Sequence, residues 1–337
     1  MKTNDECANA GSRDFEREIL KFMPQDIRDL ILRIDPKSLE SLEEIRLRAD
    51  KPLMLQNRYG DWFVDRNGKL ASDYKSSRLV SQNEIIKTVE LMSENSIYAY
   101  QDEIKNGFIT LKGGHRVGIV GRVVLDGYGI KNIKDISALN VRVSREIIGC
   151  SERVLKHIIK GDIDIFNTLI ISPPQCGKTT MLRDMARSLS DGIPALKFKG
   201  VKVGVIDERS EIGACFKGVA QNRLGARTDV LDGCPKSIGM TLILRSMSPQ
   251  VIITDEIGNS GDKEAVMQVI NAGVKIITSA HGYNISELKA RREVIGLIEQ
   301  RIFERYIVLS NSNGPGTVKE VIDGIAMKAI EEGDDAA

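Results

Sequence analysis

The stretch TLIISPPQCGKTT runs from Thr168 to Thr180. Its first four residues are β-branched or apolar and predict a buried strand. A short loop follows, and Lys178 opens a helix that we expect to continue to Ser190. The backbone N–H groups of such a loop and of the helix N-terminus converge on one point and bind phosphate oxygens. The stretch therefore predicts an α/β fold with a phosphate site at the carboxyl end of a strand.

The residues of this loop suit a nucleoside triphosphate with magnesium. Gly177 lets the backbone approach the ligand, Lys178 supplies a cation for the outer phosphates, and Thr179 offers a hydroxyl to Mg²⁺. We expect ATP, although no base-recognition signature excludes GTP. The candidate nucleotide-binding residues are Ser172, Pro173, Pro174, Gln175, Cys176, Gly177, Lys178, Thr179 and Thr180.

Ser172 departs from the usual motif, which begins with glycine. If that position required a positive φ, serine would cost about 1 kcal/mol. The preceding apolar strand instead favours extended geometry, in which serine costs little.

Two adjacent carboxylates follow the apolar segment Val251–Thr254. Strands of a parallel sheet present their carboxyl ends at one edge, where ligands bind. Asp255 is a candidate to hold Mg²⁺ through a water, and Glu256 to orient or deprotonate the attacking water. The alternative is an exposed pair of residues at the start of a helix.

Two further predicted strands end in polar residues. Val203–Ile206 is followed by Asp207 and Glu208, and Glu208 competes with Glu256 for the role of catalytic base; a solvated charge run is the alternative. Lys275–Thr278 leads to His281, which we assign to nucleotide binding as a sensor of the γ-phosphate, although a lone histidine is often a surface residue.

Phosphoryl transfer also needs cations against the developing negative charge. Spacing does not choose among the arginines, and a surface ion pair is an alternative for each. We assign Arg227 and Arg142 as catalytic candidates, and the remaining ones are Arg116, Arg122 and Arg245.

Composition limits the class of protein. Lys and Arg total 48 and Asp and Glu total 47, so no global charge attracts nucleic acid or anionic lipid. The five cysteines form no C-x-x-C pair, which favours a reducing compartment. The polar start and the lack of an 18-residue apolar run predict a cytoplasmic protein.

The chain divides by pattern near residue 150. Residues 1–150 predict an α+β domain, whose first 13 residues we expect to be flexible, with a helical region over 15–34 that breaks at Pro24 and a capping box at Ser81. Residues 151–337 alternate apolar strands with helices, which is typical of a mainly parallel sheet covered on both faces. The last predicted helix covers 285–303, and the last strand Tyr306–Leu309.

The four strand-end motifs, taken in order, resemble those of the secretion ATPases of type II and type IV systems. In that family a Walker A loop, an Asp box, a Walker B strand and a His box follow one another. They correspond here to Ser172–Thr180, Asp207–Glu211, Ile252–Glu256 and Thr278–Gly282. The segments at 113–122, 136–142, 173–180, 207–212 and 227–232 are similar, as a set, to one branch of these ATPases, the stage III sporulation protein AA family.

The resemblance implies more than the spacing does. It implies a RecA-like P-loop ATPase domain with a mainly parallel sheet, joined to a smaller N-terminal α+β domain. It implies a homo-hexameric ring with ATP between subunits and arginines of the N-terminal domain, among them Arg116, Arg122 and Arg142, completing the site. It also implies that the protein acts in the mother cell with the other proteins of a membrane-embedded sporulation channel. The protein would be peripheral to the membrane and attached through these partners.

Three functions remain open from the sequence. The paired carboxylates favour a ring-forming ATPase motor. A nucleotide-gated scaffold with little turnover is the second. A RecA-like motor on single-stranded nucleic acid is the third, and the near-neutral charge and the few aromatic residues count against it.

Overall fold

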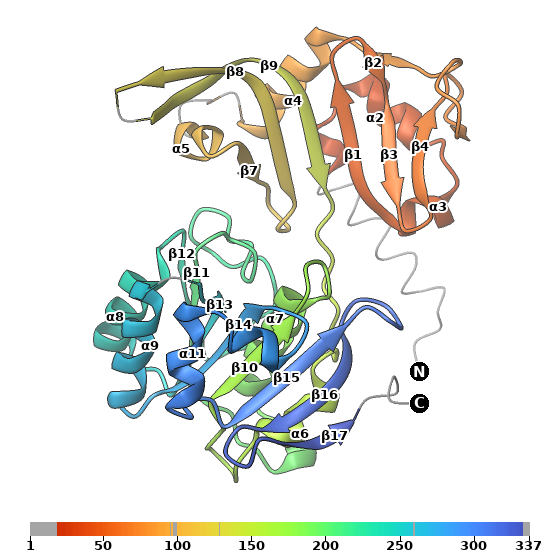
Figure 1. Ribbon diagram of the computed structural model, residues 1–337. Helices are drawn as coiled ribbons and strands as arrows, with labels where there is room; N and C mark the ends of the chain where they lie inside the picture. Colours follow the sequence, from red (N-terminus) through yellow and green to blue (C-terminus); the bar gives the residue numbers. More distant parts are fainter. Residues whose placement is uncertain (1–18, 95, 97–99, 128, 259, 333–337) are drawn as a thin grey trace. The chain divides into compact units, whose positions relative to one another are not determined.

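The computed structural model describes residues 19–332, apart from 95, 97–99, 128 and 259. The chain divides into two compact units, Met1–Arg145 and Glu146–Ala337, so that the division falls just before the residue at which the sequence pattern changes. Each unit has its own main sheet (Figure 1). The segment 1–13 and the first residues of the helical region predicted over 15–34 lie outside the described residues.

The first unit contains an antiparallel sheet of seven strands. Their order is β5-β4-β3-β1-β9-β8-β7, and every neighbouring pair is antiparallel. The strands are β1 (Leu42–Arg48), β3 (Met54–Asn57), β4 (Gly60–Val64), β5 (Leu70–Ala71), β7 (Phe108–Thr110), β8 (Arg116–Asp126) and β9 (Gly129–Arg142). The short strands β2 (Lys51–Pro52) and β6 (Leu79–Val80) pair with each other.

Short helices accompany this sheet. They are η1 (Leu20–Phe22), α2 (Gln25–Ile31), α3 (Pro36–Glu40), α4 (Gln82–Met92) and α5 (Gln101–Lys105). The predicted break at Pro24 is confirmed, because η1 ends before it and α2 begins after it. The predicted capping box is confirmed as well: the Ser81 side chain accepts from the Glu84 amide, and the Glu84 carboxylate accepts from the Ser81 amide.

The second unit contains a sheet of eight strands that carries the predicted phosphate loop. Their order is β12-β11-β13-β14-β10-β15-β16-β17. The six strands from β12 to β15 are parallel, and the last two are antiparallel. The strands are β10 (Thr168–Ser172), β11 (Val203–Asp207), β12 (Thr228–Asp232), β13 (Val251–Glu256), β14 (Lys275–His281), β15 (Arg305–Ser310), β16 (Thr317–Asp323) and β17 (Lys328–Glu332). The predicted mainly parallel sheet is confirmed.

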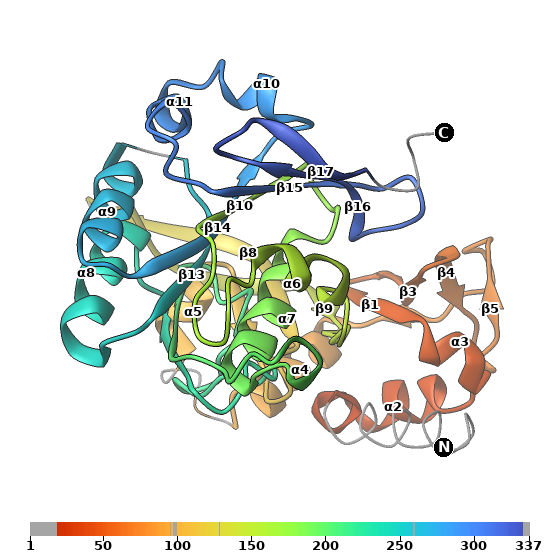
Figure 2. The same ribbon diagram turned by 90° about the horizontal axis from the view of Figure 1, so that it is seen from below.

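Helices cover both faces of this sheet (Figure 2). They are α6 (Glu152–Ile158), α7 (Lys178–Asp191), the 3₁₀ turn η3 (Pro194–Leu196), α8 (Lys236–Met247), α9 (Ser260–Asn271), α10 (Ile285–Leu288) and α11 (Arg292–Glu299). Side chains of α6 and α7 pack on one face, and those of α8, α9, α10 and α11 pack on the other. In β13, Ile253 belongs to the first core and Ile252 to the second, as expected for a strand buried on both faces.

The single helix predicted over 285–303 is wrong, because the chain forms two shorter helices there. α10 ends at Leu288, and Arg291 has an extended backbone with φ −95° and ψ 119° before α11 begins. Leu288 and Val294 are both buried in one core. Residues six apart face different sides of a continuous helix, so the break allows both to reach the core.

Candidate nucleotide site

The phosphate loop joins β10 to α7 in the way that the sequence predicts. Gly177 has a left-handed backbone (φ 84°, ψ 14°) at the start of α7, and among the described side chains none caps the first turn of this helix. Gln175 also has a positive φ, 58°. The amides of a long helix that no side chain caps are available to an anion, and the helix dipole favours the same charge.

Ser172 lies in the strand and not in the tight part of the loop. It is the last residue of β10, is fully buried, and stands in register with His281 of β14. Its hydroxyl donates to the carbonyl of Pro173 at 2.9 Å. The extended geometry expected for serine at this position is confirmed, and Gln175 takes the left-handed conformation instead.

The carboxylates of the Walker B segment lie at the same edge of the sheet. Asp255 and Glu256 end β13, which is separated from β10 by β14 alone. The ammonium of Lys178 lies 3.5 Å from Oε2 of Glu256, whose side chain is 43% exposed. The structure thus brings Lys178 of the predicted phosphate loop and the candidate base together. Thr179 and Thr180 follow in the first turn of α7.

Asp207 of the Asp box has a structural role. It is fully buried at the end of β11, and its carboxylate accepts from the amides of Glu211 at 2.8 Å and Gly213 at 2.7 Å. Burial raises the pKa of this carboxyl group, although the backbone hydrogen bonds act in the opposite sense. Asp207 therefore fixes the loop 208–213 beside the site.

A lysine that the sequence interpretation missed joins the other two carboxylates. Lys236 forms an ion pair with Glu208, and its ammonium lies 3.0 Å from Oδ1 of Asp255. Burial by itself would lower the pKa of this lysine, but its contacts with Glu208 and Asp255 raise it. The signal in the sequence was a lysine at the first position of a helix, where the dipole disfavours a cation.

The His box lies between the two halves of the site. The Thr278 hydroxyl donates to the carbonyl of Asp255 at 2.7 Å. His281 ends β14, in register with Ser172. The structure therefore brings His281 to the start of the phosphate loop.

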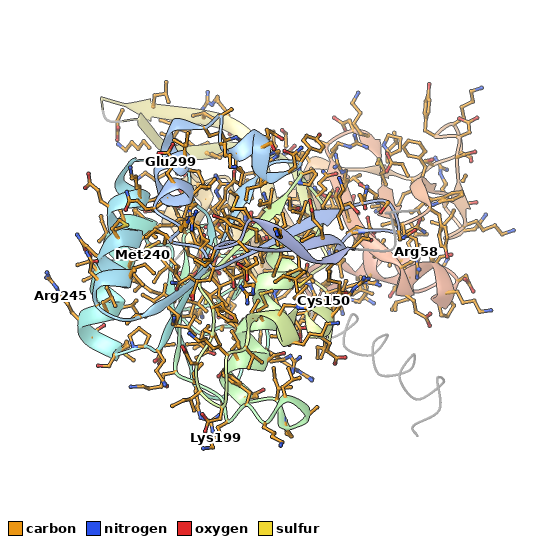
Figure 3. The ribbon with its side chains drawn as sticks, turned by 60° about the horizontal axis from the view of Figure 1, so that its bottom comes forward. Arg58, Cys150, Lys199, Met240, Arg245 and Glu299 are labelled. Carbon is orange, nitrogen blue, oxygen red and sulfur yellow. The ribbon has the colours of Figure 1, made fainter. Side chains whose placement is uncertain are left out.

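The catalytic arginine remains open within the second unit. Arg227 precedes β12 and so lies at the amino end of the strands, where its guanidinium donates to the carbonyl of Ser190 at 2.6 Å. The structure does not bring Arg227 to the carboxyl edge of its own chain, because the whole of β12 separates it from that edge. Arg245 is exposed in the last turn of α8 and points away from the fold (Figure 3).

The other candidate arginines belong to the first unit. Arg142 ends β9 and pairs with Glu44 at 3.6 Å, and 64% of its side chain is exposed. Arg122 pairs with Asp135 at 2.9 Å. The guanidinium of Arg116 stacks 3.6 Å above the ring of Phe108. Arg142 remains a prediction for the catalytic role.

The turn between β15 and β16 supports the phosphate loop from the side away from the carboxylates. The Gly316 amide donates to the carbonyl of Cys176 at 3.0 Å. A Cβ on Gly177 would lie 2.9 Å from the Gly316 nitrogen. Glycine is therefore required at residue 177 by its backbone angle and by this close approach.

The donor set fits a magnesium ion that arrives with phosphates. Within the described part of the chain, no group of three or more His, Cys, Asp or Glu side chains could hold a metal ion by itself. Oδ1 of Asp255 is buried against the Lys236 ammonium at 3.0 Å, and a carboxylate oxygen with more than one lone pair can also accept from a metal-bound water. Thr179 and Asp255 are the residues that would hold the ion.

In the parallel sheet a phosphate loop follows β10, and carboxylates end β13, which β14 separates from β10. This arrangement defines a RecA-like P-loop nucleoside-triphosphatase fold. The chain matches the model of one family of that class over residues 13–328, and it belongs to this family, described as Sporulation stage III, protein AA. The stage III sporulation protein AA of Bacillus subtilis strain 168 is 39% identical over 306 residues, which cover 91% of this chain and 94% of that protein.

Solved structures of secretion ATPases share the fold. The ATPase DotB of Yersinia pseudotuberculosis has a TM-score of 0.54 at 14% identity, over 85% of this chain and 76% of that chain. The pilus retraction motor PilT, solved with bound ADP, has a TM-score of 0.50 at 15% identity, over 81% of this chain and 75% of that chain. No helix in the described residues has the length and apolar character needed to cross a bilayer.

Proposed function

We propose that this protein is an ATP-hydrolysing motor that energises or assembles a secretion-like channel at the forespore membrane during sporulation. Membership of the sporulation family supports the biological setting. The likeness of the fold to the ATPase DotB and to the pilus retraction motor supports the motor. The observation that carries the proposal is the approach of Lys178 to Glu256 at the mouth of the phosphate loop.

In this proposal the phosphate loop holds the β- and γ-phosphates of ATP. The amides of residues 173–178 and the Lys178 ammonium bind the phosphate oxygens, and the Thr179 hydroxyl and Asp255 hold the magnesium ion. Bound Mg²⁺ would neutralise charge that develops on the transferred phosphate.

Glu256 is the favoured base over Glu208. Both carboxylates pair with a lysine, but the partner of Glu256 is the lysine of the phosphate loop, whereas Glu208 pairs with Lys236. When the γ-phosphate binds the Lys178 ammonium, it replaces Glu256 as the partner of this lysine. Glu256 can then orient and deprotonate the attacking water. Glu208 has no such coupling to the phosphate loop.

The assembly proposed here is a homo-hexamer that works with other proteins of a membrane-embedded sporulation channel on its cytoplasmic, mother-cell side. Support comes from the family and from the motors that share the fold. An arginine of the first unit, with Arg142 as the candidate, would complete the site of its own or a neighbouring chain. Hydrolysis would then change the arrangement of the units.

Phosphate release by the purified protein tests the proposal. We expect wild-type turnover with Mg²⁺ and ATP, no nucleotide binding by Lys178→Ala, and binding with at least about hundredfold slower hydrolysis by Glu256→Gln. Glu208→Gln is the matched control and should retain most of the rate. Wild-type binding without turnover under assembly conditions would instead identify a nucleotide-gated scaffold, and turnover stimulated by single-stranded oligonucleotide would identify a nucleic-acid motor.

A further inference from the structure

Lys236 is a buried cation at the place where the candidate metal ligand lies. It is the first residue of α8 and is 7% exposed. Its ammonium reaches two strand ends at once, Glu208 after β11 and Oδ1 of Asp255 in β13. A lysine side chain is expensive to bury unless it is paired, so these two carboxylates account for its position.

The position of Lys236 is electrostatically unfavourable for two local reasons. A cation at the N-terminus of a helix opposes the helix dipole, and burial opposes its charge. The ion pairs with Glu208 and Asp255 offset both penalties, because carboxylates crowd this edge of the sheet. Asp207 and Glu211 lie near enough to add negative charge to Asp255. Without Lys236, Asp255 and Glu208 would face the negative charge of these two residues with no ammonium between them.

The contact between Lys236 and Asp255 places a positive charge against the carboxylate that is the candidate metal ligand. The Lys236 ammonium lies 3.0 Å from Oδ1 of Asp255, and the charge of this ammonium favours the ionised carboxylate. An ammonium that contacts a carboxylate oxygen in this way can be exchanged for another cation. The alternative cation beside this oxygen is the divalent ion of a metal nucleotide, which Asp255 would hold through a water.

We propose that Lys236 is a resident counter-cation that occupies the electrostatic place of the divalent ion until the nucleotide brings that ion. Lys236 keeps free Mg²⁺ from binding at Asp255, and when the metal nucleotide enters it gives up Asp255 and keeps its ion pair with Glu208. The inference rests on the proposed function only in assigning Asp255 to the metal. Lys236 is thus a positioning residue that makes metal binding conditional on nucleotide.

The exchange also connects the site to the loop that Asp207 fixes. Glu208 is the first residue of the loop 208–213 after β11. A change in the contact between Lys236 and Glu208 therefore changes the electrostatic environment of that loop. The metal nucleotide would therefore be sensed on β11, two strands beyond β14, through one side chain.

Binding of Mn²⁺ to the full-length protein without nucleotide tests the inference, with electron paramagnetic resonance as the readout. We expect Lys236→Met to bind Mn²⁺ at least about tenfold more tightly than the wild type, because the cation that competes for Asp255 is gone. Lys236→Arg keeps the charge and should bind as weakly as the wild type. Adding Asp255→Asn to Lys236→Met should abolish the gain.

Lys275→Met is a matched control. Lys275 also bridges two carboxylates, Asp164 at 3.8 Å and Glu304 at 3.6 Å, but it begins β14 and so lies at the opposite end of the strands. Its loss should leave Mn²⁺ binding at the wild-type level. Equal Mn²⁺ affinity of the wild type, Lys236→Met and Lys275→Met would overturn the inference.

The double variant Lys236→Met/Glu208→Gln protects the test from a folding failure. It removes one positive and one negative charge, so the net charge of the cluster is unchanged, and Asp255 is still freed of its cation. We expect it to bind Mn²⁺ more tightly than the wild type, and wild-type affinity here counts against the inference. Nucleotide binding by the wild type is a separate measurement, so loss of the proposed function and loss of this inference are distinguishable.

Discussion

At residue 177 the backbone and a neighbouring turn both require glycine. The φ of 84° is a left-handed conformation that a side chain disfavours, and the amide of Gly316 leaves no room for a Cβ. The hydrogen bond from Gly316 to Cys176 holds the two segments at this distance. The shape of the phosphate loop is therefore fixed by contacts as well as by its own sequence.

Gly177→Ala should abolish nucleotide binding, because the methyl group would force the loop and the Gly316 turn apart. Gly161→Ala is the matched control: its φ is 88°, but a Cβ there meets nothing within 4 Å. The control carries only the strain of a left-handed residue, about 1 kcal/mol, and should bind normally. Calorimetric titration with nucleotide measures both, and equal affinities of the two variants would contradict the packing argument.

Most residues of the site could be predicted because their signals are local. Lys178 and Thr179 belong to a loop whose order is dictated by phosphate geometry, and Asp255 and Glu256 end an apolar strand. Lys236 could not be assigned, because its partners come from β11 and β13, and their adjacency is set by the sheet order. Arg227 stood beside a strand in the sequence, but its neighbour Thr228 begins that strand and so places the arginine at the far edge.

At the scale of elements, Asp184 joins α7 to the segment that precedes α6. Its buried carboxylate accepts from the amides of Gly149 at 3.0 Å and Ser151 at 2.9 Å, and from the Ser151 hydroxyl at 2.6 Å. Burial would raise the pKa of this group, but the hydrogen bonds from Ser151 and Gly149 and the contact with Arg187 hold it below its usual range. The charged form of Asp184 therefore stabilises the fold.

Asp184→Asn should lower the free energy of unfolding by about 1–3 kcal/mol at neutral pH, because an amide cannot accept all of these bonds. A lowered pKa gives stability that is fully present above the unfolded pKa, about 3.9, and is lost as the pH falls through the lower folded value. The difference between variant and wild type should thus be constant above about pH 5 and shrink below about pH 4.

Urea unfolding at several pH values measures this difference. Asp162→Asn is the control, since Asp162 forms an exposed ion pair with Lys199 at 2.6 Å and should matter little. A pH-independent loss in Asp184→Asn would show that the ionised carboxylate is not the cause.

Elements that are continuous apolar runs could be predicted from the sequence, and elements whose bounds depend on distant partners could not. The five buried parallel strands are apolar runs, and each was placed within a few residues of its observed bounds. The sequence does not predict β12, β16 or β17, because they lie toward the two ends of the strand order and their burial is partial. The sequence favours a helix throughout 285–303 and so predicts one helix there, whereas core packing at Leu288 and Val294 sets the break between α10 and α11.

At the scale of the whole molecule, the second unit has a core of its own on each face of its sheet. We expect the fragment 146–337 to fold and to bind Mg²⁺ and ATP within a few-fold of the full chain. Hydrolysis should fall by about a thousandfold if an arginine of the first unit completes the site.

Phosphate release by the fragment and by full-length Arg142→Ala measures this dependence, with Arg245→Ala as the control for an exposed arginine of the second unit. Loss of hydrolysis in both the fragment and Arg142→Ala would assign the role to Arg142. A fragment that hydrolyses ATP at the full-chain rate would show that the second unit contains every catalytic group.

The central position of β10 has a consequence for how the protein is made. Its five residues are all buried, and both of its neighbours in the sheet, β14 and β15, come later in the chain. A ribosome releases β10 before either neighbour, so one edge of this apolar strand stays unpaired until β14 has been synthesised and the other until β15 has. Such a strand is a template for association between nascent chains. We therefore expect the yield of folded protein in the cell to depend on how quickly translation proceeds from β10 to β15 and on chaperones that shield the strand meanwhile.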